Sequence, residues 1–119
     1  MTRQEVTYSR DLGFSQWIRA NLPDSKTGFM VTDLDFVVFN YKTKKLMFLE
    51  IKTRNSRPKE WQHQIFKNLH RWIKNGIDYD WTYLGYHLIQ FENTNFKDGK
   101  VFFDHLVTSE AELIKTLSL

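Results

Sequence analysis

The spacing of apolar residues predicts two amphipathic helices. The first set at helical spacing comprises Phe14, Trp17, Ile18 and Leu22, and it ends at Pro23. A longer set runs up to Gly76, the expected helix stop, and comprises Trp61, Ile65, Phe66, Leu69, Trp72 and Ile73. This spacing places the two tryptophans in the core. The opposite face of the second helix carries Lys59, His63, Lys67, His70, Arg71 and Lys74 and is expected to be open to an anionic partner.

Runs of β-branched and aromatic residues predict strands at residues 29–39, 46–52, 81–91 and 100–107. The polar stretch "NYKTKK" joins the first two as a hairpin. Ser109 and Glu112 form a capping box that opens a short final helix. The expected order is therefore one helix, two or three strands, the long helix, two strands and a helix, which is typical of a layered α/β fold.

From the length and composition of the chain we expect one globular domain that spans residues 1–119. Aromatic residues make up 16% of the 119 residues and charged residues 26%, a balance that favours a packed fold. There is no cysteine, no apolar run of roughly 20 residues, and no apolar signal segment at the start. We therefore expect a soluble cytoplasmic protein without a membrane partner.

The charge is distributed unevenly along the chain. Residues 42–74 contain ten Lys/Arg against two acidic residues, although the net charge of the whole chain is only +3. Such a segment suits a polyanion, and nucleic acid is the commonest one. The same residues could also serve only to solubilise a helix and a hairpin, so charge alone leaves both readings open.

Four charged residues on the predicted hairpin are candidates for chemistry. Asp33 and Asp35 would leave one face of the first strand, and Glu50 and Lys52 would share a face of the second. Adjacent carboxylates repel one another, and a bound Mg²⁺ ion, which prefers oxygen ligands, would relieve that conflict. Lys52 could then orient the attacking water and stabilise charge on a phosphate. The alternative is an exposed ion pair between Glu50 and Lys52.

The stretch from Asp35 to "EIK" at residues 50–52 resembles the signature of the PD-(D/E)XK nuclease superfamily. The resemblance covers about residues 10–90. It implies a restriction-endonuclease-like αβββαβ core, in which helices flank a central mixed sheet, here extended by a C-terminal strand and a short helix. It also implies that Asp35, Glu50 and the Ile51 carbonyl bind Mg²⁺, with Mn²⁺ as a substitute, and that Asp33 assists.

The chain departs from the superfamily pattern in two places. No proline precedes Asp35, so either Asp33 or Asp35 could be the principal ligand, and the spacing favours Asp35. The first helix lacks the carboxylate that many members carry, so this contact is missing or comes from Asp11 or Glu5. A second metal ion is therefore in doubt.

Further site residues follow from the same resemblance and from charge. Gln62, four residues before an aromatic residue, is similar to the Gln-x-x-x-Tyr element of RecB-like members, which would bring it near the metal and the phosphate. Arg54, Arg57 and Lys59 would contact backbone phosphates, with Lys67, Arg71 and Lys74 as a second tier. His63 and His70 are too far apart on the helix to share one metal, so they are expected at the surface or facing phosphate.

These observations predict a Mg²⁺-dependent nuclease that hydrolyses phosphodiester bonds, in DNA rather than RNA. Because a domain this small covers little nucleic acid, a homodimer similar to the small Holliday-junction resolvases would suit it. Two alternatives stay open. One is a non-catalytic nucleic-acid-binding module or subunit with a nuclease-like fold, and the other is an interaction domain that binds no nucleic acid.

Overall fold

The structure is a computed structural model that describes residues 13–54 and 56–119. The chain divides into two compact units, Met1–Thr32 and Asp33–Leu119. The expectation of one domain over the whole chain stays a prediction.

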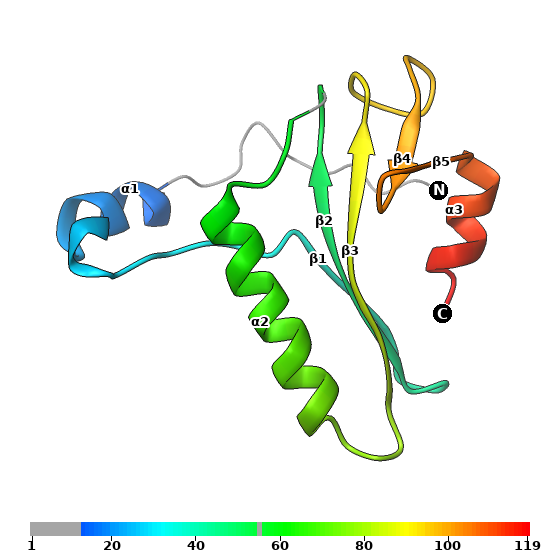
Figure 1. Cartoon of the computed structure of the whole chain (residues 1–119), viewed down its shortest axis with the longest axis horizontal. Coiled ribbons are helices and arrows are strands. Elements are labelled where there is room, and N and C mark those ends of the chain that lie inside the picture. Colours follow the sequence, from blue (N-terminus) through cyan, green and yellow to red (C-terminus); the bar gives the residue numbers. More distant parts are fainter. Residues whose placement is uncertain (1–12, 55) are drawn as a thin grey trace. The chain divides into compact units, whose positions relative to one another are not determined.

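The first unit contains α1 (Gly13–Asn21) and a 3₁₀ turn, η1 (Ser25–Thr27) (Figure 1). The predicted first helix is confirmed, and it ends before Pro23, whose ring cannot continue a helix. Asp24 caps the 3₁₀ turn because its Oδ1 accepts a hydrogen bond of 2.7 Å from the Lys26 backbone N–H. Gly28, with a φ of 94°, closes the turn in the left-handed region.

The second unit is built on a five-stranded mixed sheet in the order β1-β2-β3-β4-β5. The strands are β1 (Phe36–Asn40), β2 (Lys45–Lys52), β3 (Thr82–Phe91), β4 (Val101–Phe103) and β5 (Leu106–Thr108). The helices are α2 (Glu60–Gly76) and α3 (Glu110–Leu117) (Figure 1). Only β2 and β3 pair in parallel, because α2 carries the chain back between them, and the other neighbours are antiparallel. The α/β class is confirmed.

The predicted strand at residues 29–39 is wrong in its first half. β1 begins at Phe36, which pairs with Leu49 of β2. A strand continued backwards would have to pair with the last three residues of β2, but the Asp35 side chain intervenes there. Its Oδ2 accepts a hydrogen bond of 2.8 Å from the Ile51 backbone N–H. The predicted alternation of Asp33 and Asp35 along one strand is therefore wrong as well, because both residues precede β1.

The predicted strand at residues 100–107 is two short strands, β4 and β5, joined by a two-residue turn. Asp104 and His105 form this turn with φ of 49° and 71°. Two consecutive positive φ values match the twist of a tight hairpin and usually require Asn or Gly. The capping box at Ser109 is confirmed, since the Glu112 backbone N–H donates to Ser109 Oγ over 3.1 Å.

A bulge in β3 decides which of its side chains face α2. Between the Leu46–Tyr83 and Phe48–Tyr86 pairs, β3 has one residue more than β2. Gly85 lies in this bulge with a φ of 102°. As a result Tyr83 and Tyr86 lie on the same face of the sheet, although simple alternation would put them on opposite faces.

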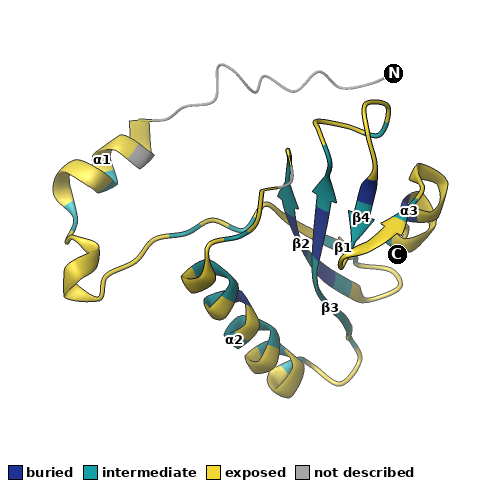
Figure 2. Cartoon of the chain, turned by 45° about the horizontal axis from the view of Figure 1, so that its top comes forward, coloured by how far each residue is buried: buried dark blue, intermediate teal, exposed yellow. Residues whose placement is uncertain are grey.

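The two faces of the sheet have different packing. On one face, a buried cluster with α3 comprises Met47, Leu49, Ile89, Val101 and Leu113 (Figure 2). On the other face, α2 packs through Phe66, whose ring lies 5.2 Å from that of Tyr86. The expectation that Trp61 and Trp72 belong to the core is wrong, since they are 38% and 54% exposed. No described helix is long and apolar enough to cross a membrane.

Candidate active site

Glu50 is the most deeply buried charged residue that the structure describes, with 1% of its surface exposed. It lies near the end of β2, one residue after buried Leu49. Because Phe48 of the same strand contacts Tyr83 on the α2 side, alternation places Glu50 on that side too. Its Oε2 is buried and has no hydrogen-bond partner in the structure. The alternative of an exposed Glu50–Lys52 ion pair is therefore wrong.

The Asp35 side chain meets Glu50 from the segment before β1. The two carboxyl groups share a hydrogen bond, and Asp35 also accepts from the Ile51 backbone N–H at 2.8 Å. In an extended strand the N–H and C=O of one residue point to the same side, so the Ile51 carbonyl oxygen faces the side on which Asp35 lies. Asp35, Glu50 and Ile51 thus present oxygen atoms to one small region.

The protonation of Glu50 reflects this crowding. Burial raises the pKa of Glu50 from its ordinary value of 4.5 to about 8, and the hydrogen bond and negative charge of Asp35 act in the same direction. Lys52 lowers it and Asp33 raises it. The other three predicted charged residues therefore all act on Glu50. Around neutral pH the pair formed by Asp35 and Glu50, here called the carboxylate pair, retains a proton between its two groups.

Tyr86 is a further polar residue beside the carboxylate pair, and sequence reasoning missed it. Its hydroxyl is buried without a hydrogen-bond partner in the structure. Burial, followed by the charges of Glu50, Asp35 and Asp104, raises the pKa of Tyr86. The phenol therefore keeps its proton and can donate a hydrogen bond. Gly85 is the one sequence signal for this placement, because a glycine within a strand pattern suggests a bulge.

The carboxylate pair fits a hard divalent cation in its donor chemistry. The orphaned Glu50 Oε2 and the proton shared with Asp35 mark a site in which a positive charge would replace that proton. Residues 13–54 and 56–119 contain no group of three or more His, Cys, Asp or Glu side chains that could together bind a metal ion. The ligands that this region offers are accordingly two carboxylates and one backbone carbonyl, with the remaining positions left to water.

The residues predicted to contact phosphate lie in the segment after β2 and along α2. Arg54, with a φ of 53°, turns the chain after β2, and its backbone N–H donates to the Asn93 carbonyl over 2.7 Å. Arg57 is exposed, and Lys59 precedes α2 as its N-terminal cap residue. The second tier lies on α2 and consists of Lys67, Arg71 and Lys74.

Two other predictions about site residues have different outcomes. Gln62 lies in the first turn of α2 and is half-buried, and its role beside the metal stays a prediction. Asp11 and Glu5, the candidates for the missing first-helix carboxylate, lie outside the described residues.

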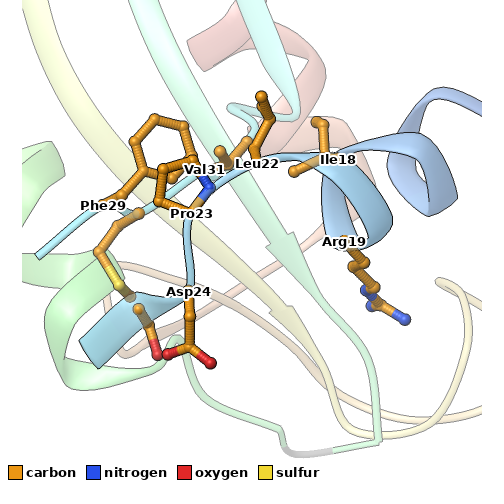
Figure 3. Close-up of a pocket in the computed structure, with 9 residues that line it drawn as sticks. Ile18, Arg19, Leu22, Pro23, Asp24, Phe29 and Val31 are labelled. Atoms are coloured by element: carbon orange, nitrogen blue, oxygen red, sulfur yellow. The ribbon is translucent and has the colours of Figure 1, made fainter. Parts of the chain in front are cut away.

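A larger pocket of about 430 Å³ lies within the first unit and has no comparable chemistry. Figure 3 shows its lining, which consists of Ile18, Arg19, Leu22, Pro23, Asp24, Ser25, Phe29, Met30 and Val31. The single carboxylate among them, Asp24, is used to cap the 3₁₀ turn. The carboxylate pair is therefore the stronger candidate for an active site.

Comparisons of the chain with family models, with curated proteins and with solved structures each give no match. The candidate site accordingly stands on its own geometry and chemistry.

Proposed function

We propose that this protein is a metal-dependent nuclease that hydrolyses phosphodiester bonds, with DNA as its substrate. The observation that carries this proposal is the carboxylate pair, in which buried Glu50 contacts the exposed Asp35, beside Lys52 and the Ile51 backbone. Burying the Glu50 carboxyl group in contact with a second carboxyl group is costly without a function that uses it. A site that binds a divalent cation is such a function.

Each residue of the site has a part in this proposal. Asp35, Glu50 and the Ile51 carbonyl would hold Mg²⁺ or Mn²⁺, with Asp33 close enough to influence Glu50 electrostatically. The bound ion would supply an activated water and neutralise charge on the phosphate. The Lys52 ammonium would orient that water by donating hydrogen bonds, and it would stabilise negative charge that grows on the phosphate oxygens.

The order of elements supports a restriction-endonuclease-like core only in part. The hairpin β1–β2, the helix α2 and the parallel strand β3 follow the expected order. The described residues have two strands between α1 and α2, where the αβββαβ pattern has three. The proposal therefore rests on the carboxylate site more than on the fold. The homodimer also remains a prediction.

The test compares three proteins on supercoiled plasmid, linear duplex and single-stranded DNA, each with Mg²⁺, Mn²⁺ or EDTA. Wild type should cut in the presence of metal only. Lys52→Ala should lower kcat by about 100-fold or more, as expected when a preorganised charge is removed from a transition state. Lys45→Ala is the matched control, because Lys45 is an exposed lysine at the other end of the same strand.

Equal cutting by wild type and Lys52→Ala would identify a contaminating nuclease and reject the proposal. The same experiment on RNA tests the choice of DNA.

A second candidate is a nucleic-acid-binding module that does not cut. The cations that follow β2, Arg54, Arg57 and Lys59, favour it, because phosphate binding needs no metal. This module would bind DNA with an affinity that falls with salt and is indifferent to Mg²⁺, and it would cut under none of the conditions above.

A further inference from the structure

A pocket of about 200 Å³ lies where α2, β3 and the β4–β5 turn meet. Its lining, here called the histidine pocket, consists of His63, Lys67, His70, Tyr86, Leu88, Asp104 and His105. At about 30 Å³ for each water in the liquid, this volume corresponds to roughly six or seven waters. A tetrahedral oxyanion with a few waters would fit in it.

The charges of the histidine pocket favour an anion. His63, Lys67 and His70 lie at i, i+4 and i+7, so they follow one another along one side of α2. Lys67 has no ion pair with any residue of the described ranges. His70 Nδ1 lies 3.1 Å from the Tyr83 hydroxyl, so its Nε2 is the ring atom left for a ligand. Lys67, His63 and the His105 imidazole can also donate hydrogen bonds to a ligand.

The one carboxylate in the lining is already satisfied by the protein. Asp104 Oδ1 accepts from the Leu88 backbone N–H at 2.9 Å, and its Oδ2 pairs with His87 Nδ1 at 2.6 Å. Both carboxylate oxygens of Asp104 thus already accept hydrogen bonds from residues of β3. Asp104 consequently opposes an anion less than a free carboxylate would.

The Tyr86 hydroxyl supplies a second and independent observation. It is a buried hydroxyl with no hydrogen-bond partner in the structure, and Tyr86 is one of the residues that line the pocket. An orphaned buried hydroxyl is costly, and a ligand oxygen in the pocket would satisfy it. Tyr86 lines the histidine pocket, and the charges of Glu50, Asp35 and Asp104 all act on its phenol.

The conformation of the β4–β5 turn brings His105 to the same place. A φ of 71° is unfavourable for histidine, and such strain often accompanies a functional site. Asp104 gains two hydrogen bonds from this turn, whereas no side-chain hydrogen bond holds His105 among the described residues. His105 also lines a neighbouring pocket of about 250 Å³ with Arg57, Gln90 and Phe102. The turn thus places His105 in the lining of both pockets.

We propose that the histidine pocket binds a phosphate group, and that this phosphate belongs to the nucleic-acid backbone next to the bond at the carboxylate pair. The second half of the proposal rests on the nuclease function, whereas phosphate binding itself does not. Lys67 supplies the charge, and Tyr86, His63, His70 and His105 supply the hydrogen bonds.

The test follows the imidazole nitrogens by NMR while inorganic phosphate is added to ¹⁵N-histidine-labelled protein in EDTA. His63, His70 and His105 should shift along one saturable curve. His87 should shift least, because both of its ring nitrogens are occupied, by Asp104 and by the Leu84 carbonyl. Absence of saturable shifts at the three pocket histidines would overturn the proposal.

Three variants separate a pocket from a generally basic surface. Lys67→Ala should weaken phosphate binding about tenfold, the effect of losing one charge-assisted contact. Lys115→Ala removes an equal charge from an exposed position on α3 outside the pocket, and it should leave the affinity unchanged. Tyr86→Phe keeps the ring beside Phe66 and should weaken binding several-fold while leaving the fold intact. Equal losses in Lys67→Ala and Lys115→Ala would reject the pocket.

The link to the substrate is tested separately on DNA. In a wild type that cuts DNA, Lys67→Ala should raise KM about tenfold with little change in kcat, and an unchanged KM would refute this half of the proposal. A wild type that binds phosphate but never cuts would refute the nuclease function and leave the phosphate pocket supported.

Discussion

The carboxyl groups of Asp35 and Glu50 share a hydrogen bond, although Asp35 precedes β1 and Glu50 is buried within β2. Asp35 reaches this position because its Oδ2 takes the Ile51 backbone N–H that a longer β1 could have used. The same side chain therefore ends the β1–β2 ladder and completes the carboxylate pair.

The carboxylate pair makes stability depend on pH. The pKa of Glu50 is 4.5 ordinarily and about 8 in the folded protein, so between these values the folded state holds a proton that the unfolded state lacks. This contribution is complete below about pH 4.5, and it is lost as pH rises toward 8. The free energy of unfolding should thus fall by several kcal/mol, at most about 5 kcal/mol, across the window. Urea unfolding at pH 5, 6, 7 and 8 measures it.

Glu50→Gln should flatten this pH dependence, whereas Asp78→Asn, which changes an exposed carboxylate, should keep it. Mg²⁺ should stabilise wild type more at pH 8 than at pH 6, because it replaces the shared proton. A response to Mg²⁺ that is the same in Glu50→Gln would place the ion elsewhere.

The bulge in β3 depends on glycine at position 85. Gly85→Ala should destabilise the protein by about 1–3 kcal/mol, because its φ is 102° and the new Cβ would lie 3.1 Å from His87 Nε2. Gly76→Ala is the matched control. A Cβ added at Gly76 would meet no atom within 4 Å, and this residue ends α2, so the change should be neutral or slightly stabilising. Thermal unfolding of both variants decides the point, and equal effects would contradict it.

The interaction between Asp104 and His87 stabilises the position of the β4–β5 turn against β3. Asp104→Asn should cost about 1–3 kcal/mol, since it weakens a hydrogen bond to a charged group within a satisfied network. In a double-mutant cycle with His87→Ala, the coupling should exceed about 0.5 kcal/mol. Additive effects of the two substitutions would show that the 2.6 Å contact contributes nothing.

The cations after β2 should set the salt dependence of DNA binding. Arg57→Ala and Lys59→Ala should each weaken binding to all sequences alike and reduce the slope of log affinity against log salt by about one. Lys97→Ala, an exposed lysine in the loop between β3 and β4, should change neither quantity. Binding measured by fluorescence anisotropy from low to high salt tests this. Slopes unchanged in all three variants would remove these residues from the interface.

Helix α2 shows how far periodicity alone can lead. Its extent to Gly76 is as predicted, because the 3.6-residue spacing and the glycine stop are local properties. Its packed side is not as predicted. Phe66 is buried, but the histidines rather than the tryptophans meet the sheet, where His63 and His70 contact Tyr86 and Tyr83. The apolar character of a side chain indicates its tendency to be buried. Which side chains of α2 are buried, however, depends on the surface of the sheet against which the helix packs.

The sequence by itself determined the alternation of helices and strands, the turn between β1 and β2, and the charged residues that end β2, since these depend on neighbours in the chain. Only the tertiary structure decided that Asp35 ends a ladder and shares a proton with Glu50, that the bulge at Gly85 turns Tyr86 toward α2, and that Asp104 pairs with His87. These relationships join residues distant in sequence, and their energies come from burial and from hydrogen bonds that exist only once the sheet has formed.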